Sequence, residues 1–435
     1  MSFHDAYGLP VTAASRTAVE AYDRGVQGLL GFSANIIDCF NEALTEDPDF
    51  ALARAALAVS LYLSEKIPEA RVAMETAVAA AARLPERERR HIEALALWVG
   101  GRGNEAASLM KAILTEDPRD VILIQRLYFS YFWQGRSADM LELTESVRQS
   151  FRDDSYVLGL HAFSLEENRH FDEALALAER ALALNPKDAW AVHALAHVHY
   201  ESGDNARGIA ALPPRIDPCD HLGYFRNHLL WHLALMYLAD GDYERVRRLY
   251  ESVFAGTPVA IASDLQDSVS LAWRLDLFGH PDPARWASLG AAARNWLELP
   301  LLLFHDLHVG MALAASGDWA SAERQLERLR ERGKRTRNAT LPEVVVPLLE
   351  GLHAFARGDY AAAAGRMEPI QNRIVEVGGS HAQREVFHDT LLAAALRADL
   401  DDRATTLLHR RLAKRANPGH YWTTLASAGR GAARS

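Results

Sequence analysis

Histidines crowd one stretch of this 435-residue chain, and their spacing suits metal binding or proton transfer. Two pairs stand out, His193 with His197 and His228 with His232. The members of each pair are four positions apart, which places both imidazoles on one face of a helix. Two imidazoles at this spacing can bind the same ion, as in zinc-binding helices. We therefore expect these four residues either to bind one divalent metal ion (Zn, Mn or Fe) or to pack as ordinary hydrogen-bonded histidines.

A second set of polar residues follows on the helices predicted after the histidines: Asp267, Asp306, His308 and Arg384. Aspartate and histidine can act as general acids and bases, so these residues are the predicted catalytic groups. Each also has a structural interpretation, because a buried aspartate often only caps a helix or bonds a neighbouring one. Asp306 and His308 are two positions apart and point in different directions on a helix. At least one of these two is therefore expected to be structural.

Arg384 follows a glycine-rich turn. The sequence over 378–380 is Gly-Gly-Ser, which lacks the lysine and the preceding strand of a phosphate-binding loop. It predicts a tight turn into a helix that Ser380 caps. Arg384 would then either hold a substrate carboxylate or pair with Glu376 or Glu385.

The elements that must position these residues are helices arranged as repeats. Three similar segments end at Pro48, Pro118 and Pro186, about 70 residues apart, which is twice the 34-residue tetratricopeptide period. Glycine followed by aspartate recurs between such markers, as at Gly203 and Gly241. Glycine accepts the left-handed geometry of a helix end, and proline cannot lie inside a helix. The pattern predicts an all-α, tetratricopeptide-like superhelix of roughly ten helix-turn-helix repeats with a concave groove.

The repeat register aligns the candidate residues. The first helices of successive units are predicted at 190–201, 224–239, 264–277, 301–315 and 345–356. In tetratricopeptide-like folds the first helices of the units line the concave groove. The histidine pairs and the predicted catalytic residues could therefore face one pocket in that groove. Buried polar groups cost free energy unless they are paired, so such a concentration of them requires an explanation.

Composition limits the setting and the partners of the chain. A net charge of −10 offers no general attraction for phosphate backbones, so we expect no nucleic-acid partner. Cys39 and Cys219 are the only cysteines, which excludes a disulfide scaffold and fits a cytoplasmic location. We see neither a signal peptide nor an apolar stretch long enough to span a membrane. We expect one domain over 1–425, a frayed tail over 426–435 and a solvated basic loop over 331–340.

One set of residues, spread over nearly the whole chain, matches a family pattern. Its members are 188–193, 196–199, His228, Trp231, His232, Asp267, Ser268, Arg274, Leu275, Asp306, His308, 373–375, 378–380, 382–384 and 386–387. Together they resemble the tetratricopeptide repeat protein 38 family. His381 departs from that family, in which we expect asparagine, so Arg384 is the better catalytic candidate. The resemblance implies a compact tetratricopeptide-like superhelix and no established biochemical activity.

Two functions from different classes follow. The first is an enzyme, a hydrolase or lyase, that acts on a carboxylate- or amide-bearing small molecule by metal-assisted or histidine acid–base chemistry. The alternative is a tetratricopeptide interaction scaffold that binds a peptide or protein in its groove, as most proteins of this architecture do. Metal storage or sensing is a third reading, which needs the histidines but neither Asp306 nor Arg384. We expect no membrane partner, and a homo-oligomer is compatible with every reading.

Overall fold

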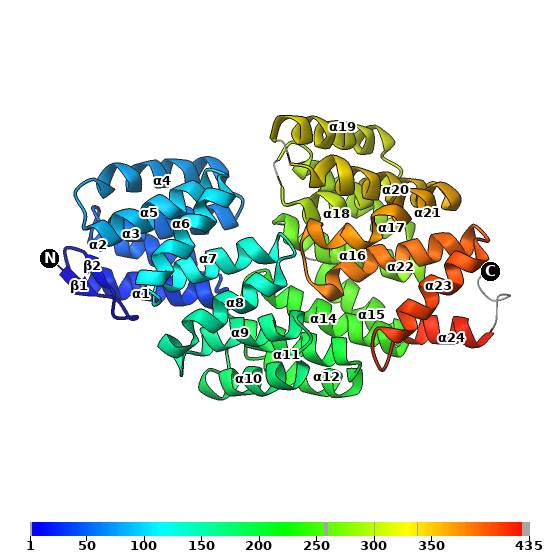
Figure 1. Ribbon diagram of the computed structural model, residues 1–435, viewed down its shortest axis with the longest axis horizontal. Coiled ribbons are helices and arrows are strands. Elements are labelled where there is room, and N and C mark those ends of the chain that lie inside the picture. The colour runs from blue at the N-terminus through cyan, green and yellow to red at the C-terminus, as the bar shows by residue number, and fades with distance from the viewer. Residues whose placement is uncertain (1, 256–259, 300, 337, 429–435) are drawn as a thin grey trace. The chain divides into compact units, whose positions relative to one another are not determined.

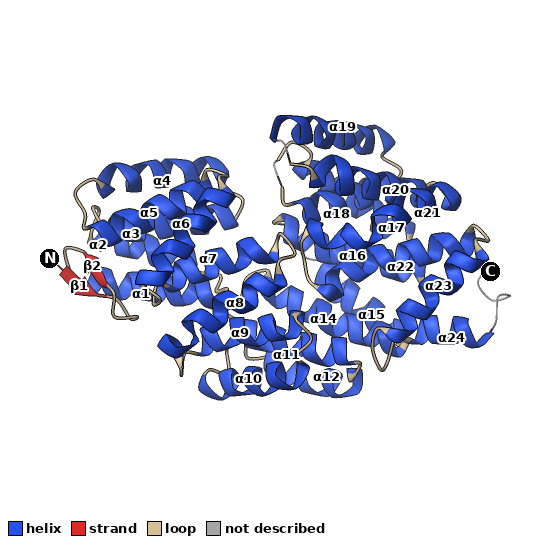
Figure 2. Ribbon diagram, viewed as in Figure 1, coloured by secondary structure: helices blue, strands red, loops and turns tan. Residues whose placement is uncertain are grey.

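Regular structure in the computed structural model is almost entirely helical (Figure 1, Figure 2). The structure describes residues 2–255, 260–299, 301–336 and 338–428. The all-α prediction is confirmed. A short hairpin that the sequence analysis did not anticipate pairs strand β1 (Ser2–His4) with strand β2 (Pro10–Thr12) in antiparallel fashion. Among the described residues, no helix combines the length and the apolar character needed to cross a lipid bilayer.

The described residues group into two compact units. Unit 1 comprises 1–131, 136–194 and 217–226, and unit 2 comprises 132–135, 195–216 and 227–435, in each case within the described ranges. The single domain over 1–425 stays a prediction. Of the predicted tail, residues 426–428 are helical, as the end of α24 (His420–Ala428), and 429–435 lie outside the described residues.

Unit 1 is built from pairs of adjacent helices. Its helices are α1 (Arg16–Gly31), α2 (Ile36–Glu46), α3 (Ala51–Leu63), α4 (Ile67–Ala81), α5 (Glu86–Val99), α6 (Gly103–Glu116), α7 (Val121–Phe132, to Tyr131), α8 (Ser137–Val147), η1 (Arg148–Phe151), α9 (Ser155–Glu167), α10 (Phe171–Leu184) and the start of α11 (Ala189–Ser202). Helix α1 packs on α2, α3 on α4, α5 on α6 and α9 on α10, and Figure 1 shows α3 to α6 side by side. The predicted proline markers Pro48, Pro118 and Pro186 lie between these pairs, where a missing backbone N–H costs nothing.

Unit 2 continues the same pattern. Its helices are the rest of α11, α12 (Asn205–Ala211), α13 (Pro213–Ile216), α14 (Phe225–Asp240, from Asn227), α15 (Tyr243–Leu249), η2 (Tyr250–Phe254), α16 (Ala262–Leu277), α17 (Pro283–Ala293), η3 (Arg294–Trp296), α18 (Leu303–Ala315), α19 (Trp319–Thr336), η4 (Leu341–Val345), α20 (Val346–Ala356), α21 (Tyr360–Met367), η5 (Glu368–Val377), α22 (His381–Arg397), α23 (Asp401–Ala413) and α24. Helix α16 packs against α17, α18 and α22, and α18 also packs against α20 (Figure 1).

The five predicted first helices correspond to α11, α14, α16, α18 and α20, so the repeat register places the right segments in helices. One local expectation is wrong. The basic run predicted as a solvated loop over 331–340 begins inside α19, which continues to Thr336. The charged residues at the start of this run continue the amphipathic pattern of α19, because they lie on its exposed face. The helix therefore continues into the basic run.

Two of the predicted turn glycines occupy positions where any other residue would be strained. Gly203 ends α11 with φ of 83°, and a Cβ atom there would lie 2.5 Å from the backbone nitrogen of Asn417. Gly241 ends α14 with φ of 78°, and its Cβ would lie 2.7 Å from the ring of His420. The left-handed conformation and the close approach of another segment both require glycine. These two turns therefore hold the 416–420 segment against α11 and α14 within unit 2.

Candidate functional site

Three of the four predicted histidine ligands lie together in unit 2. His197 lies on α11, and His228 and His232 lie one turn apart on α14. The Nε2 atoms of His228 and His232 are 3.3 Å apart. The ring centroids of His197 and His232 are 4.4 Å apart. His197 and His232 are fully buried and His228 is 8% exposed, so the cluster is inside the unit rather than on its surface.

Asp267, a predicted catalytic residue, contacts this cluster from α16. Its Oδ2 atom lies 2.8 Å from Nδ1 of His228, and its Oδ1 atom accepts a hydrogen bond from Nε2 of Gln266 at 3.1 Å. The indole of Trp231 stacks on the His228 ring with 5.4 Å between the ring centroids. The carboxylate and the indole together fix the orientation of His228. The Asp267 carboxylate is therefore directed at the His228 imidazole.

Burial sets the protonation of His197. Desolvation, with His228, His381, Arg415 and Arg384 adding like-charge repulsion, holds the pKa of His197 well below its ordinary value of 6.5. The ring is therefore neutral at physiological pH. A neutral imidazole offers a lone pair to a metal ion or a hydrogen-bond donor.

His193, the fourth predicted ligand, belongs to unit 1 and packs among aromatic rings. The centroid of its ring lies 4.5 Å from that of Trp190, 4.9 Å from that of Phe163 and 5.5 Å from that of Phe225. Within unit 1 its surroundings are those of a core residue. The stretch over 217–226 that brings Phe225 there also bonds back to the start of the chain, where the backbone N–H of Ala34 donates to the carbonyl of His221 at 2.9 Å.

Asp306 and His308 lie on α18 and have separate internal partners. Nη1 of Arg332 on α19 donates to Oδ2 of Asp306 at 2.8 Å. Nδ1 of His308 donates to the carbonyl of Phe304, one turn earlier, at 2.8 Å. Burial raises the pKa of Asp306 to about 7, although Arg332 opposes the shift, and burial lowers the pKa of His308 to about 3. The two groups face different neighbours, as their spacing on a helix predicts.

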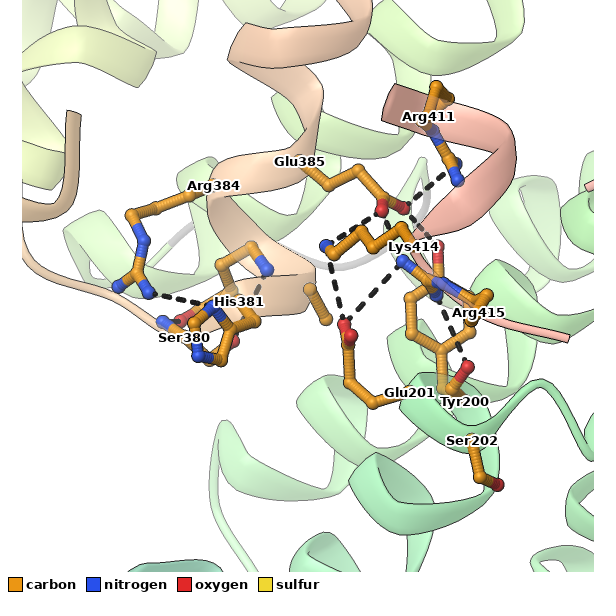
Figure 3. Close-up of polar contacts among 12 residues, drawn as sticks. Tyr200, Glu201, Ser202, Ser380, His381, Arg384, Glu385, Arg411, Lys414 and Arg415 are labelled. Carbon is orange, nitrogen blue, oxygen red and sulfur yellow. Dashed lines mark hydrogen bonds and ion pairs between the residues drawn. The ribbon is translucent and has the colours of Figure 1, made fainter. Parts of the chain in front are cut away.

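Arg384 lies in the first turn of α22, beside the predicted tight turn (Figure 3). Ser380 caps this helix as expected, and Gln383 completes a capping box. The Arg384 guanidinium donates to the carbonyl of Gly379 and approaches Nδ1 of His381 at 3.3 Å. These contacts occupy the guanidinium on the turn that precedes its own helix.

The two carboxylates considered as partners for Arg384 bind other cations. Glu376 pairs with Arg373 at 2.6 Å. Figure 3 shows Arg384 and Glu385 extending from α22 in opposite directions, with Glu385 facing the end of α23. Neither pairing considered from the sequence is among the hydrogen bonds that hold Arg384 in this turn.

A buried ion cluster around Glu385 escaped the sequence analysis. Its carboxylate accepts hydrogen bonds from the hydroxyl of Tyr200 at 2.7 Å and from Lys414 at 2.9 Å, and it also binds Arg411 and Arg415 (Figure 3). Burial by itself would raise the pKa of Glu385, but these three cations outweigh it and hold the pKa well below 4.5. The available signal was weak: an acidic pair four residues apart on α22, Glu385 and Asp389, followed by basic residues at the end of α23 and just after it.

A smaller polar site in unit 1 lies under the N-terminal hairpin. Nδ1 of His91 on α5 lies 2.6 Å from Oδ2 of Asp120, and both residues are buried. They line a cavity of about 10 Å³ together with Asp5, Asp23 and Arg87. That volume is enough for about one water molecule and for nothing larger. The cavity is therefore too small to be a substrate pocket.

A larger groove lies on the surface of unit 2, beside the last turns of α19. Its volume is about 410 Å³. It is lined by Glu327, Arg330, Glu331, Gly333, Lys334, Pro342 and Val346. None of the predicted catalytic or metal-binding residues lines this groove. The roomy site and the reactive side chains are therefore in different places within the unit.

Comparison with known proteins supports a repeat architecture. A sequence model of the tetratricopeptide repeat family matches residues 165–213, which run from the end of α9 to α13 and include α11 with His197. The match covers one part of the chain. It agrees with the helix pairs and turn glycines described above, so the tetratricopeptide-like character of the fold is established and the concave groove stays a prediction.

Solved structures align over most of the chain at low similarity. The crystal structure of Rap protein complexed with competence and sporulation factor aligns with 12% identity, 90% of this chain, 100% of that chain and a TM-score of 0.43. The APC/C hetero-tetramer Cut9-Hcn1 aligns with 12% identity over 86% of this chain and 76% of that chain, with a TM-score of 0.36. The structure of Naa15/Naa10 bound to HypK-THB aligns with 11% identity over 92% of this chain and 69% of that chain, with a TM-score of 0.25. These scores are too low to assign a partner or a reaction to this chain.

Proposed function

We propose that this chain is an interaction protein that binds a peptide segment of a partner protein through its tetratricopeptide-like helices. One observation carries the proposal. The predicted catalytic side chains Asp267, Asp306, His308 and Arg384 are at most 5% exposed, and each is engaged by another side chain or a backbone carbonyl. These side chains could contact a substrate only after their contacts within the protein were broken. The repeat match over 165–213 supports the same class, because stacked helical repeats present binding surfaces to other molecules.

The surface groove of unit 2 is the binding site that we propose. Pro342 and Val346 contribute apolar surface to its lining, and the lining side chains of Glu331 and Lys334 are 71% and 74% exposed. A groove of this kind suits an extended or helical peptide with one apolar anchor flanked by charged residues of both signs. The anchor would contribute most of the affinity, and the flanking charges would orient the peptide.

Selection from a phage-displayed peptide library against the purified full chain tests this proposal. We expect enriched peptides with an apolar anchor, and we expect their affinity, measured by fluorescence anisotropy, to fall about tenfold in Lys334→Glu, which corresponds to about 1.4 kcal/mol. The Glu331–Lys334 ion pair is exposed, so its loss should leave stability nearly unchanged. Arg245→Glu is the matched control, because Arg245 is an exposed cation on α15 whose side chain is 55% exposed.

Three results would refute the groove proposal. The first is that no peptide is enriched above a selection without protein. The second is that enriched peptides bind Lys334→Glu and wild type equally well. Binding that both charge reversals weaken alike would show non-specific electrostatics instead of a groove.

An enzyme remains the second candidate because of one specific arrangement. Asp267, His228 and His232 form a chain of contacts of 2.8 and 3.3 Å, which is the arrangement that carboxylate–histidine relays use in acid–base catalysis. A hydrolase or lyase acting on a carboxylate- or amide-bearing metabolite would use His228, the least buried member at 8% exposure, as its acid or base. A thermal-shift screen of metabolites in which stabilisation disappears in His228→Ala would favour this candidate over peptide binding.

Two finer expectations accompany the proposal. We place the chain with the tetratricopeptide repeat protein 38 family on the residues that resemble it, and we expect it to act in the cytoplasm. Co-fractionation of the endogenous chain with cytoplasmic markers checks the second.

A further inference from the structure

We propose that His197, His228 and His232 bind one divalent transition-metal ion, with zinc as the reference case, inside unit 2. The site is formed by α11 and α14 and does not depend on the peptide groove. It would be either a structural centre or the centre of the second candidate function. The following contacts support it independently of that choice.

The separation of two imidazole nitrogens is the first support. Nε2 of His228 and Nε2 of His232 are 3.3 Å apart. Two nitrogens that each lie about 2.0–2.1 Å from a tetrahedral zinc ion are about 3.3–3.4 Å apart. The one-turn spacing on α14 therefore already holds two donor atoms at the distance that a shared ion needs.

The third donor comes from the neighbouring helix. A ring nitrogen of His197 and a ring nitrogen of His232 lie within 4.8 Å of each other. The ring centroids of His197 and His232 are 4.4 Å apart, so we take His197 as the third ligand, and its side chain has to move toward the α14 pair to reach a shared ion. Three imidazoles leave the fourth tetrahedral position to a water molecule or another ligand.

Asp267 supplies the support that metal-binding histidines usually have. Its carboxylate lies 2.8 Å from Nδ1 of His228, the ring nitrogen that faces away from His232. A carboxylate in that place fixes the tautomer with the lone pair on Nε2 and makes that nitrogen a stronger donor. Gln266 in turn holds Asp267 through a hydrogen bond of 3.1 Å.

The proton inventory is consistent with binding. In the metal-free state His228 donates its Nδ1–H to Asp267, so its Nε2 accepts a hydrogen bond from the Nε2–H of His232. When the ion binds, His232 must carry its proton on Nδ1 instead, and both Nε2 lone pairs then face the ion. Apart from the nitrogen–metal bonds, no other bond forms or breaks.

A hydrogen-bonded histidine pair without metal is the competing explanation, and a metal titration separates the two. We would prepare the full-length, untagged chain free of metal with a chelator and titrate it with ZnCl₂ by calorimetry. CoCl₂ would be added in parallel, because tetrahedral Co²⁺ absorbs strongly in the visible range. We expect about one ion per chain and a tetrahedral cobalt spectrum.

Variants assign the site. Asp267→Asn keeps the ligands and should weaken zinc binding by roughly 10–100-fold, and His228→Ala and His232→Ala should weaken it more. The matched control is His353→Ala, which removes a buried imidazole of the same unit on α20 and should bind zinc like wild type. Circular dichroism checks that each variant is folded.

The proposal is overturned if the metal-free wild-type chain binds no zinc, which needs no variant and would leave a hydrogen-bonded pair only. It is also overturned if zinc binds equally well to the folded His228→Ala/His232→Ala chain. If that double variant does not fold, an octahedral cobalt spectrum of the wild-type chain would overturn the proposal instead, because three imidazoles predict a tetrahedral one. None of these outcomes affects peptide binding by the surface groove.

Discussion

At the scale of single residues, the buried titratable groups of unit 2 fall into two kinds. Glu385 keeps its charge because Arg411, Lys414 and Arg415 surround it. Asp306 pairs with Arg332 and also feels the charge of Arg328, but burial outweighs both cations, so its pKa is raised to about 7. A buried charge is tolerated where several partners share it and is neutralised where they do not. The contributions of these two carboxyl groups to stability therefore change in opposite directions with pH.

Removing the Glu385 charge should destabilise the fold. Glu385→Gln leaves three cations facing an uncharged amide, which we expect to lower the free energy of unfolding at pH 7 by about 3–5 kcal/mol. Because the folded-state pKa lies well below the ordinary value of 4.5, the contribution is present above pH 4.5 and is lost as the pH falls below it. Urea unfolding at pH 7 and pH 3 measures both effects.

The exposed pair Lys111–Glu142 provides a control for that experiment. Its side chains are 61% and 66% exposed, so Glu142→Gln should change stability little at either pH. An equally small effect of Glu385→Gln at pH 7 would show that the buried cluster contributes nothing to stability.

Asp306 should give the opposite pH dependence. Its pKa is 3.8 in an ordinary setting and about 7 in the fold, so the folded state holds an extra proton between these values. Stability from this group is present below pH 3.8 and is lost as the pH rises toward 7. Relative to Asp306→Asn, the wild-type chain should therefore lose stability between pH 4 and pH 7, in denaturant unfolding at several pH values. Parallel curves for the two chains would contradict the shifted pKa.

At the scale of elements, the turns between helices decide which segments meet. Helices within a repeat are specified locally, by apolar spacing and by glycine or proline at their ends. Whether a turn is replaceable depends on what approaches it. Gly203 and Gly317 have nearly the same backbone conformation, with φ of 83° and 77°, but only Gly203 has another backbone against it.

Substituting alanine for Gly317 and for Gly203 should separate the cost of a left-handed backbone conformation from the cost of a clash with a neighbouring segment. Gly317→Ala meets open space, so it should lose only the roughly 1 kcal/mol of a left-handed non-glycine residue. Gly203→Ala places a methyl group 2.5 Å from the nitrogen of Asn417 as well, so it should cost clearly more. Thermal and urea unfolding of both variants measures the difference. Equal losses of stability in the two variants would mean that the 416–417 segment moves away from the added methyl group at no cost in free energy.

At the scale of the whole molecule, the two compact units are not consecutive pieces of chain. Helix α11 contributes 189–194 to unit 1 and 195–202 to unit 2, and the 217–226 stretch belongs to unit 1 although both its flanks belong to unit 2. A helix that is half lost also loses the hydrogen bonds of its next turn. The chain connectivity thus links the folding of one unit to that of the other.

We accordingly expect the full chain to unfold in one transition, as the sequence-based expectation of a single domain over 1–425 requires. Calorimetry checks this, because the calorimetric and van't Hoff enthalpies agree for a two-state transition. The same measurement on His232→Ala should show one transition at a lower temperature. Two resolved transitions in the wild-type chain would establish two independently folding domains.

The sequence by itself determined the elements. The apolar spacing, the proline markers and the turn glycines are local features, and they predicted the all-α fold, the positions of α11, α14, α16, α18 and α20, and the capping of α22 by Ser380. The same local geometry placed His228 and His232 on one helix face. The partly basic run inside α19, the helical residues 426–428 and the N-terminal hairpin were not predicted.

The tertiary structure decided which side chains meet. Tyr200 and Glu385 are 185 positions apart in the chain and form one hydrogen bond. His228 and Asp267 are 39 positions apart and lie within 2.8 Å. Helical periodicity is set within a few turns and shows on which face a residue lies, whereas partner choice depends on how distant helices pack. For that reason the sequence could nominate Asp267, Asp306, His308 and Arg384, but only the packed helices showed that their partners lie within the protein.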